Sequence, residues 1–457
     1  MIIENTISRQ IAKFALNLKY EDLPDDVVNE VKRFLYDSVG CALGGYHAKD
    51  VNILHNIYKN IGGKPEATII GFGDKIPAIN ASFVNSLMVR SLDFNDIYWK
   101  EDPSHPSDII PAALSVGEMV NADMKDVIVA IVLGYEFEMR MCEIAIPGVR
   151  ERKWHHATLT QFVSPIVAGK LLNLTEDEMV NAIGISASHN FTIGCPAAGK
   201  LTMMKNTVDP MAVQSGVLAA IMAKQGYTGT EEVFEGKEGL IDVLGPRWDT
   251  SKLLTNLGSP FKILVCGMKA FPAEALTHTH ITATLKAVLE NDIKPEDIKE
   301  VTVTALAKAV DILFDINKYE INSRETADHS LPYCIARAII DRKITTQSFD
   351  EDKLVDPLLK NIIYKIKGEP SKKFEKIFPE KQPSQVVIKT KDNKKYKVYL
   401  EYPKGDPREP MTIEDLDNKF SALSSKLINK NKQNRIKTTI FNCENISVQE
   451  FMAQLIL

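Results

Sequence analysis

The feature that most constrains this chain is a change in its hydrophobic pattern near residue 260. Before that point, apolar residues recur every three or four positions in one segment after another, which predicts helices. After it, β-branched residues alternate with polar ones over 297–306 and 384–403, and Asp392-Asn393 is typical of a turn, so this region predicts strands. We therefore expect a mainly α protein in which an all-helical bundle domain is joined to an α+β domain.

The domain boundaries follow from the length and from one linker. A chain of 457 residues is longer than a single hydrophobic core usually supports, so two domains are expected. The Pro- and Gly-rich stretch 402–412 is typical of a linker, and helical spacing returns after it. We assign residues 1–266, completed by 408–457, to the all-helical domain, and residues 267–407 to an inserted α+β lid domain.

Several helices have recognisable ends. The segment 23–45 begins with proline and acidic residues and ends in two glycines, and 174–190 opens with a capping box formed by Thr175 and Glu178. The segment 210–229 has proline in its first turn and glycine near its end, so we expect its helix to begin at Pro210. Further helices are predicted in the lid domain over 277–290, 328–342 and 350–367.

Composition excludes several classes of function. A net charge of −5 gives no general attraction to nucleic acid or to an anionic membrane. The six cysteines lie far apart without a C-x-x-C pair, which argues against an iron–sulfur motif and fits reduced thiols in a cytosol. The N-terminus has the pattern of a helix and not of a signal peptide, and the longest apolar run, 127–135, is half a membrane span. We expect a cytoplasmic protein without nucleic-acid or membrane partners.

Two short motifs resemble known sites only superficially. The sequence GCPAAGKL (194–201) matches a phosphate-binding loop, but Leu201 stands where that loop needs Ser or Thr, and no convincing strand precedes it. The sequence THTH (277–280) offers two histidines, but positions two apart do not share a helix face and no third ligand is evident. We interpret these histidines as polar-face or capping residues, and we expect no metal site.

Five segments combine charged and histidine side chains in a way that a pure scaffold does not require. Two of them lie in residues 89–114, where a run of such side chains precedes an apolar helical segment, so that this stretch is either a solvated loop or the rim of an active site. The segments are RSLDFND (90–96), SHPSD (104–108), KWHHAT (153–158), KLTMMKN (200–206) and KAFPAE (269–274).

These segments, together with RETADHSLPY (324–333), resemble the MmgE/PrpD family, and the resemblance extends from the first helix to about residue 425. The resemblance implies a helical domain and an α+β lid domain, a homodimer, and a small tricarboxylate substrate in the cleft between the domains. It also implies chemistry without a metal or an organic cofactor. Arg324, Asp328 and His329 are expected to support the lid or the dimer and not to touch substrate.

Within the family, the details favour the dehydratase branch. The decarboxylase branch resembles HSMDFDDT at the first motif and has histidine after FPA, whereas this chain has Arg90, Asn95 and Glu274 at the differing positions. Two departures concern both branches. Ile97 replaces the usual threonine, and Asp209-Pro210 replaces small residues, which would alter how the next helix begins and where Lys205 points.

Dehydration of a hydroxy-tricarboxylate requires an acid, a base and several cations. A proton must leave the carbon next to a carboxylate while hydroxide departs from the neighbouring carbon. His105 and His156 are the expected acid and base, because imidazole titrates near neutral pH. Asp93 is expected to orient His105 or a lysine, or to be the base itself. Each of these residues also has a structural interpretation, such as capping a helix.

Cations are needed to hold the substrate carboxylates. Lys205 and Lys269 are expected to neutralise them, and either could protonate the departing hydroxyl if burial lowers its pKa. Arg90 is a candidate carboxylate clamp, and Lys200 competes with Lys205 for its role. Glu274 is expected to pair with a lysine or to take part in acid–base chemistry.

The leading interpretation is a cofactor-independent hydro-lyase that converts 2-methylcitrate to 2-methyl-cis-aconitate in propionate breakdown. The alternatives on the same scaffold are a citrate or aconitate hydratase, a cis-aconitate decarboxylase and an epimerase. A catalytically silent tricarboxylate-binding protein is a third possibility, which the presence of so many chemically suited side chains disfavours.

Overall fold

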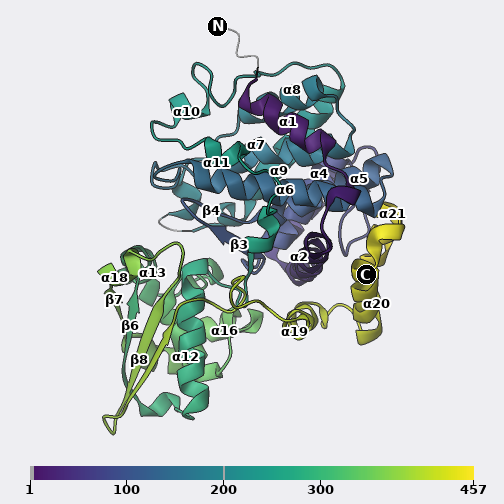
Figure 1. Ribbon diagram of the computed structural model, residues 1–457. Coiled ribbons are helices and arrows are strands. Elements are labelled where there is room, and N and C mark those ends of the chain that lie inside the picture. The colour runs from purple at the N-terminus through teal and green to yellow at the C-terminus, as the bar shows by residue number, and fades with distance from the viewer. Residues whose placement is uncertain (1–4, 199–200) are drawn as a thin grey trace.

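The computed structural model describes residues 5–198 and 201–457, and it divides into a helical body and a smaller α+β unit (Figure 1). One continuous hydrophobic core spans the helical body, and a second lies within residues 273–388. The helices of the body are α1 (Ile7–Asn17), α2 (Asp25–Gly44), α3 (Lys49–Ile61), α4 (Ala78–Arg90), α5 (Ile110–Val120), α6 (Met124–Ile144), α7 (Ala157–Leu171), α8 (Glu176–Ala187), α9 (Met204–Lys224), α10 (Leu240–Val243) and α11 (Ser251–Leu254).

The body is built around close helix contacts. Helix α9 packs against α4, α7 and α8. A Cβ placed on Gly216 of α9 would lie 2.2 Å from the Cβ of Ser164 in α7, so only glycine allows this approach. The capping box predicted at the start of α8 is present, because Thr175 and Glu178 each accept a hydrogen bond from the other's backbone N–H. Within the described residues, no helix is long and apolar enough to cross a membrane.

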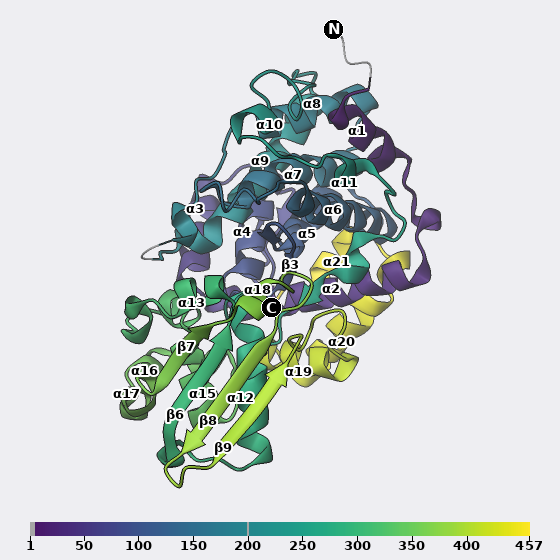
Figure 2. The same ribbon diagram turned by 60° about the vertical axis from the view of Figure 1, so that its left-hand side comes forward.

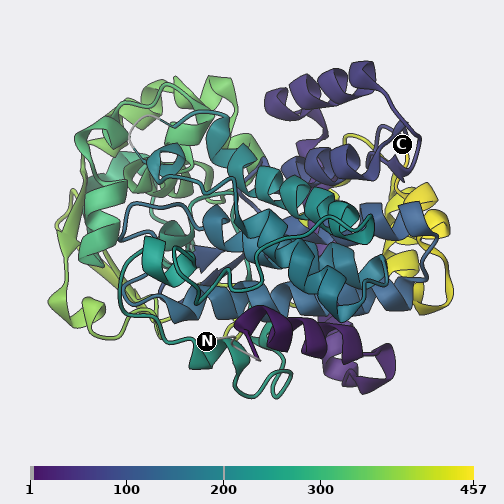
Figure 3. The same cartoon turned by 90° about the horizontal axis from the view of Figure 1, so that it is seen from above.

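The end of the chain returns to the helical body. Helices α19 (Ile413–Ser424), α20 (Lys430–Phe441) and α21 (Val448–Gln454) pack onto it, and the Phe420 ring stacks on Tyr36 of α2 with centroids 4.5 Å apart. Seen from above, these helices (yellow) and the α+β unit (green) lie on opposite sides of the body (Figure 3).

The α+β unit is a four-stranded sheet covered by helices (Figure 2). The strand order is β7-β6-β8-β9, with β6 parallel to β7 and antiparallel to β8. Its hairpin turns at Asp392-Asn393, as the sequence predicts, and Asn393 adopts a φ of 65°. The strands are β6 (Ile298–Ala305), β7 (Ile366–Pro370), β8 (Ser384–Thr390) and β9 (Lys395–Leu400), and the main helices are α12 (His278–Glu290), α13 (Ala307–Leu313), α15 (Leu331–Asp341) and α17 (Pro357–Ile363). The shorter helices are α14 (Arg324–Ala327), α16 (Glu351–Leu354) and α18 (Lys372–Glu375).

Three sequence predictions about this architecture are wrong. The helix expected to begin at Pro210 begins at Met204, so that the proline lies inside α9. The segment expected as one helix over 350–367 is interrupted after Leu354, because Asp356 caps a new helix whose first residue is Pro357, and it ends in β7. The histidines of THTH are buried at the start of α12 and are not on its polar face. For the GCPAAGKL motif, Gly199 and Lys200 lie outside the described residues.

Two small sheets accompany the helices of the body. Strands β1 (Ala67–Thr68) and β2 (Lys75–Ile76) form one, and β3 (Asp96–Trp99), β4 (Pro103–Ser104) and β5 (Gly267–Met268) form the other. In the second sheet, β3 pairs with both of its neighbours, so that Asp96 lies opposite Met268. This pairing brings the residue after β5, Lys269, next to the loop between α4 and β3.

Candidate active site

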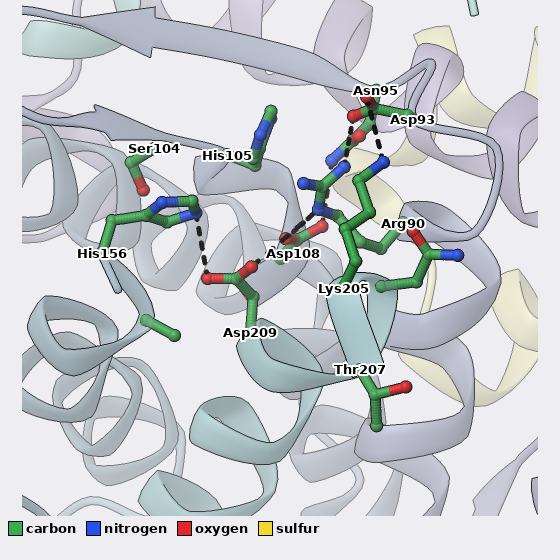
Figure 4. Close-up of polar contacts among 12 residues, drawn as sticks. Arg90, Asp93, Asn95, Ser104, His105, Asp108, His156, Lys205, Thr207 and Asp209 are labelled. Carbon is green, nitrogen blue, oxygen red and sulfur yellow. Dashed lines mark hydrogen bonds and ion pairs between the residues drawn. The ribbon is translucent and has the colours of Figure 1, made fainter. Parts of the chain in front are cut away.

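Five segments of the chain line the candidate site (Figure 4), and Glu138 of α6 lies behind them. Helix α4 ends at Arg90, and Asp93 then adopts the left-handed conformation with a φ of 50°, which aspartate tolerates better than most residues. This turn directs the chain into β3 and places the Asp93 carboxylate beside Arg90. The remaining segments are the 3-10 helix after His105, the start of α7 at His156, the first turns of α9, and Lys269 after β5.

The lysine side of the site, which we define as Arg90, Asp93, Lys205 and Lys269, is a buried cluster of three cations around one carboxylate. The Lys205 Nζ lies 3.1 Å from Asp93 Oδ2, and the Lys269 Nζ lies 2.7 Å from Asp93 Oδ1. The Arg90 guanidinium also donates to Asp93, and none of the four residues is more than 4% exposed. Burial alone would raise the pKa of Asp93, but the three cations hold it well below its usual value.

Burial acts on Lys269 in the opposite sense. It lowers the pKa of this ammonium group, and the Asp93 carboxylate opposes that effect. The lysine side therefore carries three positive charges against one negative charge. Such an excess is suited to binding substrate carboxylates.

The histidine side of the site, which we define as His105, Asp108, Glu138, His156 and Asp209, lies next to Arg90. The two imidazole centroids of His105 and His156 are 5.8 Å apart. The Nδ1 of His105 is 2.6 Å from the backbone carbonyl of Asp96, and because a carbonyl only accepts, that nitrogen carries the proton. The Nε2 of His105 is thus left with a free lone pair. Burial, together with the charges of Arg90 and Lys269, lowers the pKa of His105 well below its usual value, so the ring is neutral and its Nε2 can accept a proton.

His156 faces a carboxylate that the sequence did not identify as functional. Its Nε2 lies 3.3 Å from Asp209 Oδ1, and Asp209 Oδ2 lies 3.9 Å from the Nε of Arg90 (Figure 4). Burial would raise the pKa of Asp209, but the neighbouring His156 lowers it, so this group is ionised. Asp108, whose Oδ2 is 3.5 Å from the same Arg90 Nε, has its pKa raised well above its usual value by burial.

Glu138 lies behind the two histidines. Its Oε1 accepts hydrogen bonds from Ser104, which precedes His105, and from Thr160 of α7 at 2.7 Å. Burial raises its pKa from 4.5 to about 7, although both hydrogen bonds lower it. This carboxyl group is therefore close to half-protonated at neutral pH.

The buried Glu138 predicts a pH-dependent effect on stability. A carboxyl group whose pKa is higher in the folded protein stabilises the fold below its unfolded value, and this stabilisation is lost as the pH rises to the folded value. Between pH 4.5 and about 7, the natural protein should lose on the order of 3 kcal/mol relative to a Glu138→Gln variant, which never ionises. The melting temperatures of the two proteins, compared at about pH 5 and about pH 8, should diverge in favour of the variant. A constant difference would contradict the burial argument.

His155, His156 and Asp209 have ligand atoms within 4.8 Å of one another, which raises the question of a metal site. The backbone N–H of Ala157 donates to Nδ1 of His155 at 3.1 Å. Because that nitrogen accepts, the proton of the neutral ring is on Nε2, and neither nitrogen can then bind a metal without losing this hydrogen bond. The donor set is therefore poorly suited to a metal ion.

The remaining residues expected at the site are placed as follows. Glu274 precedes the 3-10 helix Ala275–Thr277, and it accepts from the backbone N–H of Leu276 at 2.7 Å. Burial raises its pKa to about 7. The charge of Lys269 opposes this effect, and that of Asp93 adds to it. Lys200 lies outside the described residues. Ile97 is in β3 and lines a cavity of about 320 Å³ that is also lined by Lys269 and by the 403–408 loop.

His329 is hydrogen-bonded to Asp328. Burial and the charge of Lys205 lower the pKa of His329, so it is within electrostatic reach of the lysine side. A groove of about 790 Å³ runs between the two cores and is lined by Ser91 and Asn206, the residues that follow Arg90 and Lys205. The lysine side of the site is therefore adjacent to a groove at the boundary of the α+β unit.

The site combines buried imidazoles, lysines and carboxyl groups, several with shifted pKa values. Such a combination is typical of the active site of an enzyme that uses acid–base catalysis. The family comparison agrees with that class. The chain belongs to the MmgE/PrpD family: the MmgE/PrpD N-terminal domain matches residues 9–252, and the MmgE/PrpD C-terminal domain matches residues 271–445.

Two kinds of enzyme are found among its relatives. The cis-aconitate decarboxylase of Aspergillus terreus is 23% identical, over 96% of this chain and 94% of that protein, and the one from Homo sapiens is 24% identical, over 96% and 92%. The 2-methylcitrate dehydratase of Salmonella typhimurium is 24% identical, over 88% of this chain and 87% of that protein. Identity therefore does not separate the decarboxylase from the dehydratase.

Proposed function

We propose that this protein is a hydro-lyase that removes water from a small hydroxy-tricarboxylate, with 2-methylcitrate as the leading substrate and 2-methyl-cis-aconitate as the product. The observation that carries the proposal is the pair His105 and His156, whose rings face the same site with different partners, one bonded to a backbone carbonyl and the other next to a carboxylate. The match to 2-methylcitrate dehydratases over most of the chain supports it.

The reaction divides between the two sides of the site. The free Nε2 of His105 takes the proton from the carbon next to a substrate carboxylate, and the electron pair of that C–H bond becomes the new C=C bond. The hydroxyl group on the neighbouring carbon leaves with its bonding pair, and a proton from His156 converts it to water. Lys205 and Lys269 stabilise the negative charge that develops on the carboxylate during proton removal.

A second candidate is decarboxylation of cis-aconitate. The cis-aconitate decarboxylases favour it, because their sequence identity to this chain is similar to that of the dehydratases. In that reaction the bond to a carboxylate carbon breaks, carbon dioxide leaves, and the carbanion is protonated. The Arg90 and Glu274 positions differ from the decarboxylase pattern, which is why dehydration is proposed first.

The proposal is tested by following the ultraviolet absorbance of a C=C bond conjugated to a carboxylate. The chelator-treated protein is mixed separately with 2-methylcitrate, citrate and cis-aconitate. A rise with 2-methylcitrate supports dehydration. Loss of the cis-aconitate signal with release of carbon dioxide would replace the proposal by decarboxylation, and no change with any of the three would reject both.

A homodimer and a cytoplasmic location are part of the same proposal. Helix α3 presents an apolar row, since Ile53, Ile57 and Ile61 are 43%, 45% and 66% exposed. All six cysteines are unpaired, which fits a reducing compartment. The molar mass in solution, measured by light scattering, tests the dimer.

A further inference from the structure

The two sides of the site carry opposite charge. The lysine side holds three cations around Asp93, whereas the histidine side gathers the carboxyl groups of Asp108, Glu138 and Asp209. These three acids come from the 3-10 helix after His105, from α6 and from α9. Their charges act on one another, since Asp209 raises the pKa of both Asp108 and Glu138. A substrate that spans the site therefore meets different chemistry at its two ends.

The histidine side contains several polar atoms that the protein itself does not satisfy. Among the described residues, no hydrogen-bond partner reaches Oδ2 of Asp108, Oε2 of Glu138 or Oδ2 of Asp209. The same holds for Nδ1 of His156, whose ring is only 4% exposed and whose Nε2 points at Asp209 (Figure 4). Buried polar atoms are nearly always hydrogen-bonded to protein, ordered water or a ligand, so several open ones in one place indicate that a polar group or water binds there.

The chemistry of the open atoms defines that group. Three of them are carboxyl oxygens, and ionised carboxylates only accept hydrogen bonds. Asp209 is the ionised member. The Nε of Arg90 is also without a hydrogen bond, but the Arg90 guanidinium already faces both Asp93 and Asp209, so little of its positive charge is left for a further anion. A substrate carboxylate placed here would lie against Asp209 and be repelled. A hydroxyl or ammonium group would instead donate to it.

We infer that the histidine side of the site is a subsite for a hydrogen-bond donor of the substrate, a hydroxyl or an ammonium group, from which Asp209 excludes carboxylates. The inference deepens the proposed function, on which it rests for the identity of the donor as the departing hydroxyl. That hydroxyl then lies beside His156, and all substrate carboxylates lie toward Arg90, Lys205 and Lys269.

The subsite is tested by binding, which needs no turnover. Dissociation constants are measured by calorimetry for pairs of ligands that differ in one group. Malate and succinate, and likewise citrate and tricarballylate, differ by the hydroxyl. Tricarballylate and glutarate differ by the third carboxylate. A hydrogen bond to an ionised group predicts that each hydroxyl-bearing ligand binds about tenfold more tightly than its partner.

Asp209→Asn is the decisive variant, because it keeps the shape of the side chain and removes its charge. We expect the hydroxyl advantage to shrink to about twofold or less and the binding of tricarballylate relative to glutarate to improve about tenfold. Asp292→Asn, which replaces an exposed carboxylate, is the matched control and should leave every ratio unchanged.

Equal binding within both hydroxyl pairs by the natural protein would overturn the subsite, whether or not the variant folds. Ratios that are the same in Asp209→Asn and in the natural protein would overturn the role of Asp209. If the ratios hold but no substrate is dehydrated, the subsite stands and the proposed function fails. If a substrate is dehydrated but the binding ratios are absent, the proposed function stands and the subsite fails.

Discussion

Replacing Asp93 by alanine should lower the free energy of unfolding by about 3–5 kcal/mol and abolish activity. Its carboxylate is the partner of Arg90, Lys205 and Lys269, all of which are buried. Without it, three cations face one another in a region of low polarity, and none of them can move to water without unfolding. Denaturation with urea, followed by circular dichroism, measures the loss.

Asp93→Asn separates charge from backbone strain. Position 93 has a positive φ, which asparagine adopts readily and alanine does not, so the asparagine variant keeps the turn and loses only the charge. We expect it to be destabilised nearly as much as the alanine variant. A citrate-like ligand should stabilise both variants more than the natural protein, because its carboxylates replace the missing one. Full stability of Asp93→Asn would show that the three cations do not depend on this carboxylate.

Local sequence patterns predicted most of the secondary structure because the deciding interactions are short-range. The capping box at Thr175 and the turn at Asp392-Asn393 each depend on residues that are neighbours in the chain. The errors occur where a tertiary contact outweighs a local preference. At Pro210 the sequence predicts a helix start, but α9 continues through this residue because its flanking turns pack between α4, α7 and α8.

The members of the site could be proposed from the sequence only because a family resemblance grouped them. Asp93 and Lys269 are 176 residues apart, and their contact depends on the pairing of β3 with β5. Strand β5 is too short to be predicted from the periodicity of the sequence. No local pattern distinguishes Lys205 as the lysine that reaches Asp93. The sequence supplies the residue types, and the fold supplies their distances.

From the sequence, Asp209 is expected to alter the start of the following helix and not to be a functional residue, because an aspartate before a proline commonly marks a turn. The sequence nevertheless contains a signal for its role in the site. Asp209 follows Lys205 by four positions, and residues four apart lie on the same face of a helix, so a helix that begins before Lys205 brings both side chains to one surface. Knowing the true start of α9 would have been enough.

The second large effect is expected from the two histidines, and it distinguishes their roles. His105→Gln should lower kcat by about 10²–10⁴ and should also abolish exchange of the substrate proton with heavy water, because the base that removes this proton is missing. His156→Gln should lower the rate of dehydration by a similar factor but should retain the exchange, since it impairs only the departure of hydroxide. Proton NMR of the substrate in heavy water measures the exchange, and the absorbance of the product measures dehydration.

This assignment depends on the partner of each ring. His105 donates to the carbonyl of Asp96 and keeps a free lone pair, as a base must. His156 faces the ionised Asp209, which compensates the positive charge that an imidazole carries before it gives up a proton. If His156→Gln abolishes exchange while His105→Gln retains it, the two roles are reversed, and the charge of Asp209 then acts on the base. If both variants lose exchange, removal of the proton and departure of hydroxide occur in one step.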